Sequence, residues 1–205
     1  MQFELNALKF SRVDPGEFVR FWAPRDPGDD SKYSRNLLHP NAPAEYDLNR
    51  VTELLEWKAG RFEKNARAFA KRVDMDALNA FRVGPCTTDS LQAFWDGHAS
   101  GLSRSRDSII WPIFICHIAH PDEVPIYDVN VWHAWLFLRG ELTEKLLRRT
   151  PTSFPTYLNY RSDFNELVAL AETDVRAVDK ALMAFGQFIS SGAARTLGLS
   201  TGAAS

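Results

Sequence analysis

Apolar residues recur at intervals of three or four along most of the chain, which is the spacing of one buried helix face. Helix starts are predicted at Asp14, Asp47, one of residues 87–89 and Asp128, because each can cap the helix that follows it. The apolar faces fall at Leu48, Val51, Leu54 and Leu55; Phe62, Ala66, Phe69, Ala70 and Val73; Leu91, Phe94 and Trp95; Phe164, Leu167, Val168 and Ala171; and Val175, Val178, Leu182, Phe185 and Ile189. The pattern predicts an all-α protein of about seven or eight helices.

One segment, residues 109–119, is almost wholly apolar and admits two interpretations. Its isoleucines favour a strand, whereas its length suits a helix that is buried on all sides. Pro112 falls in the first turn of such a helix, where proline is tolerated. We expect a helix, because the neighbouring segments have helical patterns and a lone strand would have no partner.

The chain of 205 residues shows no internal repeat and suits one compact domain, which we expect over residues 1–192. Residues 23–46 carry four prolines among polar residues and are expected to form an irregular insertion. Small residues dominate the end of the chain, so residues 193–205 are expected to be a disordered tail.

Charge and composition narrow the function classes. The formal net charge is −2, which excludes a strongly basic protein that coats nucleic acid but leaves room for a local basic face. Residues 61–71 hold four cations opposite the apolar face, which we interpret as a solvated surface. We expect a cytoplasmic protein, because the sequence offers no secretory signal, no membrane span and only two cysteines.

Residues 111–136 are the most informative part of the chain. They are expected to form a buried helix, a polar turn at residues 120–123, a Pro125-Ile126-Tyr127 approach and a helix that opens on Asp128-Val129-Asn130-Val131. This order resembles the helix-hairpin-helix DNA glycosylase superfamily, related to 8-oxoguanine glycosylases, in which an aspartate opens a helix in the form D-x-H-V. Residues 54–58 and 178–188 resemble a divergent bacterial branch that occurs in defence settings. The resemblance implies a glycosylase-like helical fold, double-stranded DNA as partner and no cofactor.

The resemblance implies that Asp128 is the catalytic residue, and the chemistry of the reaction agrees. Breaking an N-glycosidic bond builds positive charge on the sugar, which a nearby carboxylate stabilises. The same carboxylate can orient or deprotonate the attacking water. The alternative is that Asp128 is only a helix cap, the commonest role of an aspartate at such a position.

Further candidates follow from the same resemblance. A flipped base needs flat apolar walls and a few polar contacts to its edge. Candidate residues of the base pocket are Trp57, Lys58, Trp111, His117, Asn130 and His133. Arg104 and Arg106 stand where the hairpin of the family would meet the DNA backbone, although an exposed loop explains them equally well. Each tryptophan also suits the core.

The sequence also bears on the reaction type. No lysine occurs between Lys71 and Lys145, so the amine nucleophile of bifunctional glycosylases has no counterpart and a monofunctional enzyme is expected. The resemblance implies an abasic site as the product and a modified base, such as one in phage DNA, as the substrate. Instead of a glycine-rich hairpin, residues 101–106 read Gly-Leu-Ser-Arg-Ser-Arg. This difference favours the alternative of a non-catalytic helical module that binds nucleic acid or protein.

A third interpretation is a metal-dependent hydrolase that uses His117, His120 and Asp128. Cys116 and His133 lie near them in sequence. The chain has neither a Cys-x-x-Cys nor a His-Glu-x-x-His motif, so we expect no metal site.

Overall fold

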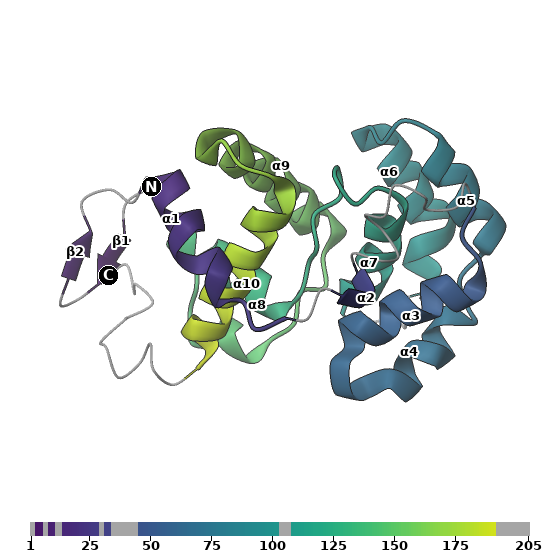
Figure 1. Ribbon diagram of the computed structural model, residues 1–205, viewed down its shortest axis with the longest axis horizontal. Helices are drawn as coiled ribbons and strands as arrows, with labels where there is room; N and C mark the ends of the chain where they lie inside the picture. The colour runs from purple at the N-terminus through teal and green to yellow at the C-terminus, as the bar shows by residue number, and fades with distance from the viewer. Residues whose placement is uncertain are drawn as a thin grey trace. The chain divides into compact units, whose positions relative to one another are not determined.

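The computed structural model describes residues 3–5, 8–10, 14–28, 31–33, 45–102 and 108–191 (Figure 1). The fold is all-α, as predicted, and the described residues include nine helices of seven residues or more. The exception is a short antiparallel hairpin of β1 (Phe3–Leu5) and β2 (Leu8–Phe10), in which Glu4 faces Lys9.

The chain divides into two compact units. Unit 1 comprises residues 1–27 and 127–205, and unit 2 comprises residues 28–126. Two such units can belong to one domain, so the single domain over residues 1–192 stays a prediction. The tail at 193–205 lies outside the described residues, as do residues 29–30 and 34–44 of the expected irregular insertion. The described part of that insertion contains a short 3-10 helix and one helical turn rather than irregular chain alone.

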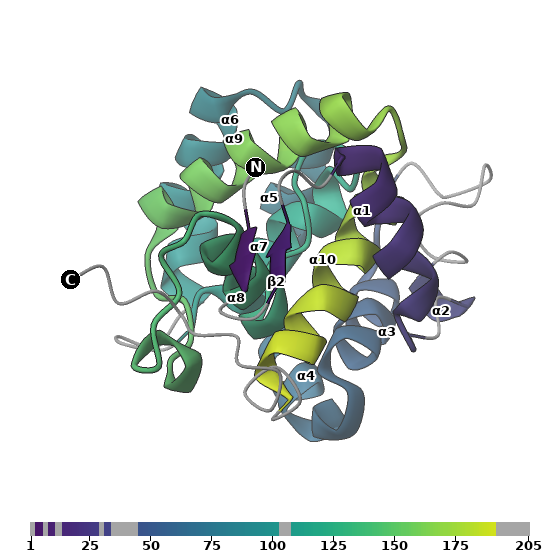
Figure 2. The same ribbon diagram turned by 90° about the vertical axis from the view of Figure 1, so that its left-hand side faces the viewer.

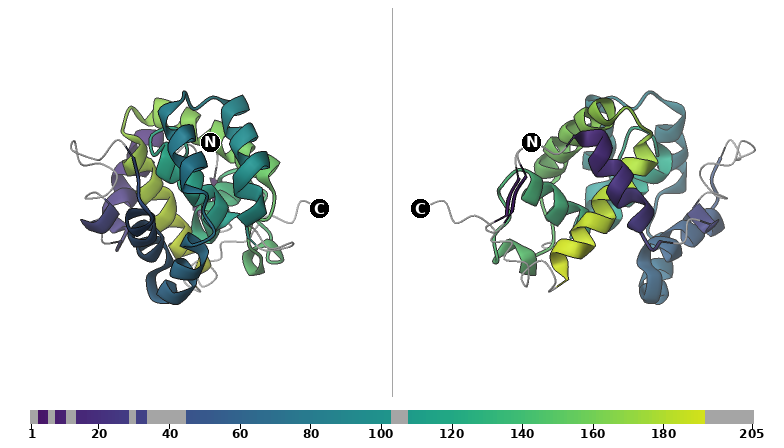
Figure 3. Two further views of the ribbon diagram at one scale, coloured as in Figure 1. Left: turned by 90° about the vertical axis from the view of Figure 1, so that its right-hand side faces the viewer. Right: turned by 60° about the vertical axis from the view of Figure 1, so that its left-hand side comes forward.

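Unit 1 is built around its last helix. Its elements are α1 (Pro15–Trp22), η1 (Ala23–Arg25), α8 (Val129–Leu138), η6 (Leu146–Arg148), α9 (Phe154–Ala171) and α10 (Val175–Ser190). The helix α10 packs against both α1 and α8, and Figures 2 and 3 show α1 lying across it. Aromatic contacts reinforce this core, since the ring of Phe185 on α10 meets Phe18 edge to face at 5.4 Å.

Unit 2 is a set of shorter helices. Its elements are α2 (Ser31–Tyr33), α3 (Leu48–Ala59), η3 (Gly60–Phe62), α4 (Glu63–Ala70), α5 (Met75–Val83), α6 (Thr88–Phe94), the π-helical η4 (Trp95–Ala99), η5 (Ser100–Leu102) and α7 (Ile110–Ala119). Residues 112–119 of α7 are all buried, which confirms the helix and rules out the strand. Three neighbours, α3, α5 and η4, pack against α7.

The predicted caps are confirmed. Asp14, Asp47, Thr87 and Asp128 each accept a backbone N–H from the third residue beyond. Three further caps were missed, at Asp74, Ser153 and Asp174. The missed cap at Ser153 changes a helix boundary most. The helix α9 begins at Phe154, ten residues before Phe164, the first apolar position predicted for it.

The predicted interior is wrong at two positions. Leu48 is 40% exposed, because it is the first residue of α3 and projects from the open end of that helix. Phe62 is 53% exposed. Gly60 adopts a φ of 54° and turns the chain into η3, so Phe62 precedes α4 and does not continue its apolar face.

No helix among the described residues combines the length and apolar character that crossing a membrane requires.

Candidate functional site

Asp128 follows four buried residues and opens α8. Its backbone is extended, with φ −148° and ψ −177°, and its Oδ1 accepts the N–H of Val131 at 2.9 Å. The side chain is half-buried. The first turn of a helix favours negative charge, so the position suits a carboxylate.

His133 lies on the same helix, one turn and a half further on, and is 1% exposed. Its Nδ1 lies 3.1 Å from the hydroxyl of Ser190, and its Nε2 lies 3.2 Å from the carbonyl oxygen of Leu146. Burial lowers the pKa of His133, against the opposing effect of backbone groups at Leu146 and Arg149 and of the Asp128 charge. A neutral ring fits both contacts, with Nε2–H donating to Leu146 and Nδ1 accepting from Ser190.

Asn130 completes the predicted residues of unit 1. It is half-buried, and its Nδ2 lies 3.7 Å from the sulfur of Met183 on α10. Asp128 and Asn130 are therefore the two predicted residues of this unit that keep exposed surface. The ring of His133 is buried, and both of its nitrogens contact other groups of the protein.

A buried cluster of tyrosines, which includes Tyr127 directly before Asp128, was not predicted. The ring of Tyr127 is 5.2 Å from that of Tyr157 and 4.9 Å from that of Tyr160. Burial raises the pKa of Tyr127 and of Tyr160, and the charges of Asp179 and Asp128 raise the pKa of Tyr160 further. The hydroxyl of Tyr127 makes no hydrogen bond to any described residue.

Asp179 is the second carboxylate of this region and was also missed. It is 2% exposed, and its Oδ2 lies 3.9 Å from Nη1 of Arg176. The sequence did carry a signal, because Asp179 stands four residues after Val175 and three before Leu182, on the apolar seam of α10. A charged residue on a buried seam is unusual and marks a position worth testing.

In unit 2 the structure brings together three of the predicted pocket residues. The ring of Trp57 lies 6.0 Å from that of Phe114, and the Nζ of Lys58 lies 5.9 Å from the same ring. The ring of His117 stacks on Phe114 at 5.4 Å. Trp57 and Lys58 are half-buried, so they keep some exposed surface that a ligand could contact.

His117 itself is fully buried and held by two contacts. Its Nδ1 lies 2.6 Å from the carbonyl oxygen of Val124, and its Nε2 lies 3.0 Å from the hydroxyl of Tyr33. Such a histidine stabilises the fold, and a role in a base pocket stays a prediction.

The remaining candidates lie elsewhere. Trp111 packs edge to face on Phe69 at 5.2 Å. Arg104 and Arg106 lie outside the described residues. Trp57, Lys58, Trp111 and His117 belong to unit 2, whereas Asp128, Asn130 and His133 belong to unit 1. The pocket as a whole stays a prediction.

The structure offers nothing in favour of the metal-dependent hydrolase. Across the described ranges, which include His117, His120 and Asp128, no group of three His, Cys, Asp or Glu residues is arranged to hold a metal ion. The Nε2 of His120 lies 2.9 Å from the carbonyl oxygen of Phe81. Burial raises the pKa of the Cys116 thiol, which disfavours the thiolate that binds zinc.

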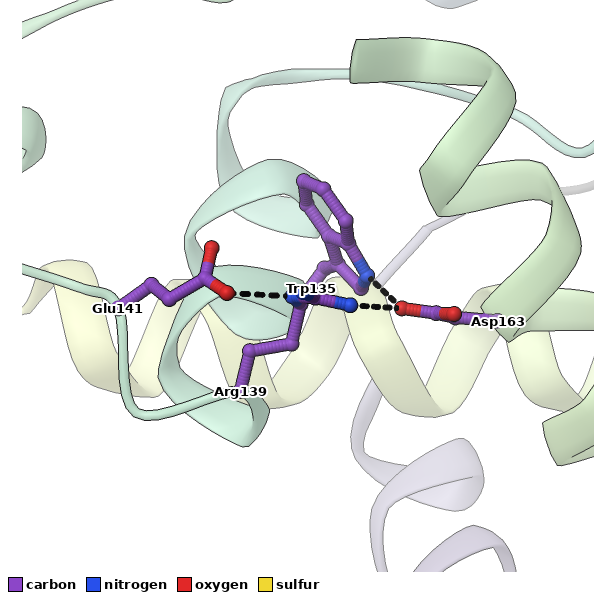
Figure 4. Close-up of polar contacts among 4 residues, drawn as sticks. All are labelled: Trp135, Arg139, Glu141 and Asp163. Carbon is purple, nitrogen blue, oxygen red and sulfur yellow. Dashed lines mark hydrogen bonds and ion pairs between the residues drawn. The ribbon is translucent and has the colours of Figure 1, made fainter.

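A polar network at the end of α8 was not predicted (Figure 4). The Oδ2 of Asp163 on α9 accepts Nε1–H of Trp135 at 2.9 Å and pairs with Nη1 of Arg139 at 2.8 Å. Arg139 also pairs with Glu141 at 2.7 Å. These contacts join α8 to α9 and involve none of the predicted site residues.

Comparisons of the chain with family models, curated proteins and solved structures found no match.

Proposed function

We propose that the chain is a monofunctional DNA N-glycosylase that flips a modified base out of double-stranded DNA and hydrolyses its glycosidic bond with Asp128. The observation that carries the proposal is the position of Asp128, half-buried at the N-terminus of α8 and directly after the Pro125-Ile126-Tyr127 approach. The resemblance of residues 111–136 to helix-hairpin-helix glycosylases adds to it, with the corresponding fold as part of the proposal.

The reaction assigns two tasks to Asp128. Its negative charge stabilises the oxocarbenium-like sugar that forms as the C1′–N bond breaks and the bonding electron pair leaves with the base. Its carboxylate then accepts a proton from the attacking water, whose oxygen forms the new bond to C1′. The departing base takes a proton from solvent, and the product is an abasic site.

Base recognition falls to side chains that keep exposed surface. An aromatic ring that stacks on the flipped base would serve any base and select none. Selection requires polar contacts, for which Asn130, half-buried in the same unit as Asp128, is the accessible candidate. We infer that the substrate base carries an additional polar or bulky group, because an unmodified base would offer such a site few distinguishing contacts.

The test is to incubate the protein with modified phage DNA and with the same sequence made unmodified, then to quantify abasic sites with an aldehyde-reactive probe. The proposal expects abasic sites on modified DNA and no strand breaks until alkali or heat is applied. Equal formation on both DNAs would contradict a modified-base substrate. Efficient trapping of a covalent adduct by borohydride would contradict a monofunctional mechanism, since trapping requires an amine Schiff base.

The second candidate is a non-catalytic helical module that binds nucleic acid or protein. One observation favours it: both ring nitrogens of His117 and of His133 lie within hydrogen-bond distance of groups of the fold. Binding to DNA without release of any base from a broad substrate panel would support this candidate over the enzyme.

A further inference from the structure

Three cations lie close together on the segment that follows α8. Lys145, Arg148 and Arg149 are all exposed and flank or belong to η6. Within the described part of the chain, none of their side chains forms an ion pair or a hydrogen bond. Their charges are therefore available to an external anion.

Nearby acids leave this segment positive. Residues 141–149 contain two carboxylates, Glu141 and Glu144. Glu141 is already paired with Arg139, the two side chains meeting at 2.7 Å. Three available cations consequently face one remaining acid, although the chain as a whole carries a net charge of −2.

Buried contacts and backbone hydrogen bonds hold the segment of residues 141–149 in place. His133 contacts the carbonyl oxygen of Leu146, while its other ring nitrogen contacts Ser190 on α10. Leu142 is 2% exposed, and the backbone N–H groups of Leu146 and Leu147 both donate to the carbonyl of Thr143 at 3.0 Å. An anchored segment loses less conformational entropy on binding than a free loop.

We propose that Lys145, Arg148 and Arg149 form a phosphate-binding surface that contacts the backbone of duplex DNA. The inference rests on the proposed function and adds to it a binding surface separate from the reacting aspartate. Closely spaced exposed cations match the regular phosphates of a duplex, and such contacts supply affinity without reading sequence. The two intervening leucines are half-buried, so the segment offers no exposed apolar side chain for insertion into a lipid surface.

The test measures the affinity for a fluorescein-labelled duplex by anisotropy at several salt concentrations. The variant is the triple substitution Lys145→Gln, Arg148→Gln and Arg149→Gln. The control removes three other exposed cations that are scattered over the chain, Arg20→Gln, Lys64→Gln and Lys71→Gln. Circular dichroism and the melting temperature establish that both proteins are folded.

Each lost phosphate contact should reduce the slope of log affinity against log salt by about one, so the triple variant should lose about three. The control should keep a slope near that of the wild type. Equal slopes for the wild type and the triple variant would overturn the inference, and so would the absence of duplex binding by the wild-type chain.

The two proposals fail in different ways. A wild-type chain whose binding depends on these three cations, but which releases no base, would overturn the proposed function and leave the inference standing. If the wild-type chain releases bases and the triple variant keeps the wild-type slope, the inference is overturned and the proposed function stands.

Discussion

Gly186 of α10 lies so close to the backbone of Asn130 on α8 that a Cβ atom at position 186 would come 2.0 Å from the Asn130 carbonyl oxygen. No real Cβ atom approaches an oxygen so closely, so any side chain at this position forces the two helices apart. Asn130 is two residues beyond Asp128. The close approach therefore fixes the first turn of α8, which positions the proposed catalytic carboxylate.

Gly186→Ala is expected to destabilise the protein by about 1–3 kcal/mol, as overpacking in a buried contact does. Urea unfolding followed by circular dichroism measures the change. Gly97→Ala is the control, because a Cβ at position 97 meets nothing within 4 Å. A variant at position 186 as stable as this control would show that the helices do not depend on the close contact.

Substitutions at Asp128 should separate capping from chemistry. Asp128→Ala is expected to lower stability by about 1 kcal/mol, because the N–H of Val131 loses its acceptor. Asp128→Asn should stay near the wild-type stability, since the amide oxygen can accept the same hydrogen bond. Thermal melts of the two variants check this, and equal losses for Asn and Ala would argue against a capping role.

The pKa of His133 predicts a contribution to pH-dependent stability. Its pKa is lowered in the fold from 6.5, so the unfolded chain binds more protons near and below that pH. This contribution is fully present above about pH 6.5 and is lost as the pH falls towards the lower pKa of the folded state. His133→Gln should therefore flatten the decline in melting temperature between pH 7 and pH 5.

The control for that measurement is His98→Gln, because the side chain of His98 is 43% exposed. This variant should keep the acid-side decline of the wild type. A decline of the same steepness in both variants would remove His133 as a source of the pH dependence.

Asp163 joins α9 to α8, since it accepts from the Trp135 indole and pairs with Arg139. Asp163→Ala is expected to cost about 1–2 kcal/mol, mostly because the indole N–H loses its acceptor; the exposed ion pair adds little. Glu166→Ala, on the same helix and exposed, is the control and should be near neutral. Denaturant unfolding of the two variants decides between these expectations.

The sequence predicted the fold class and the principal helix starts because caps and apolar periodicity are local signals. The helical patterns of the neighbouring segments, and the lack of a partner for a lone strand, were enough to identify segment 109–119 as a helix, the observed α7. The early start of α9 was missed because Tyr157 and Tyr160 pack into a tyrosine cluster rather than an aliphatic face. The approach of Gly186 to Asn130 could not be predicted, because residues so far apart meet only through the tertiary fold.

Only part of the candidate site could be predicted, because sequence patterns specify local structure and not tertiary contacts. Asp128 stood out because it caps a helix after a distinctive proline-containing approach. The partners of His117 and His133 come from distant backbone carbonyls and hydroxyls, which no local pattern specifies. Asp179 was visible on the α10 seam, yet its burial depends on the helices packed around it.

The most direct test of the account compares base release by wild type, Asp128→Asn and Asp174→Asn on DNA from which the wild type releases a base. Asp174 caps α10 in the same unit, its Oδ1 accepting the N–H of Ala177 at 2.8 Å, so it matches the capping role of Asp128 without the proposed chemistry. The account predicts that Asp128→Asn stays folded and still binds DNA. Its single-turnover rate should be at least about a hundredfold lower than that of the wild type, as expected when a general base is removed. It predicts a rate for Asp174→Asn close to that of the wild type. Equal rates for all three proteins would contradict the assignment of Asp128 as the catalytic residue.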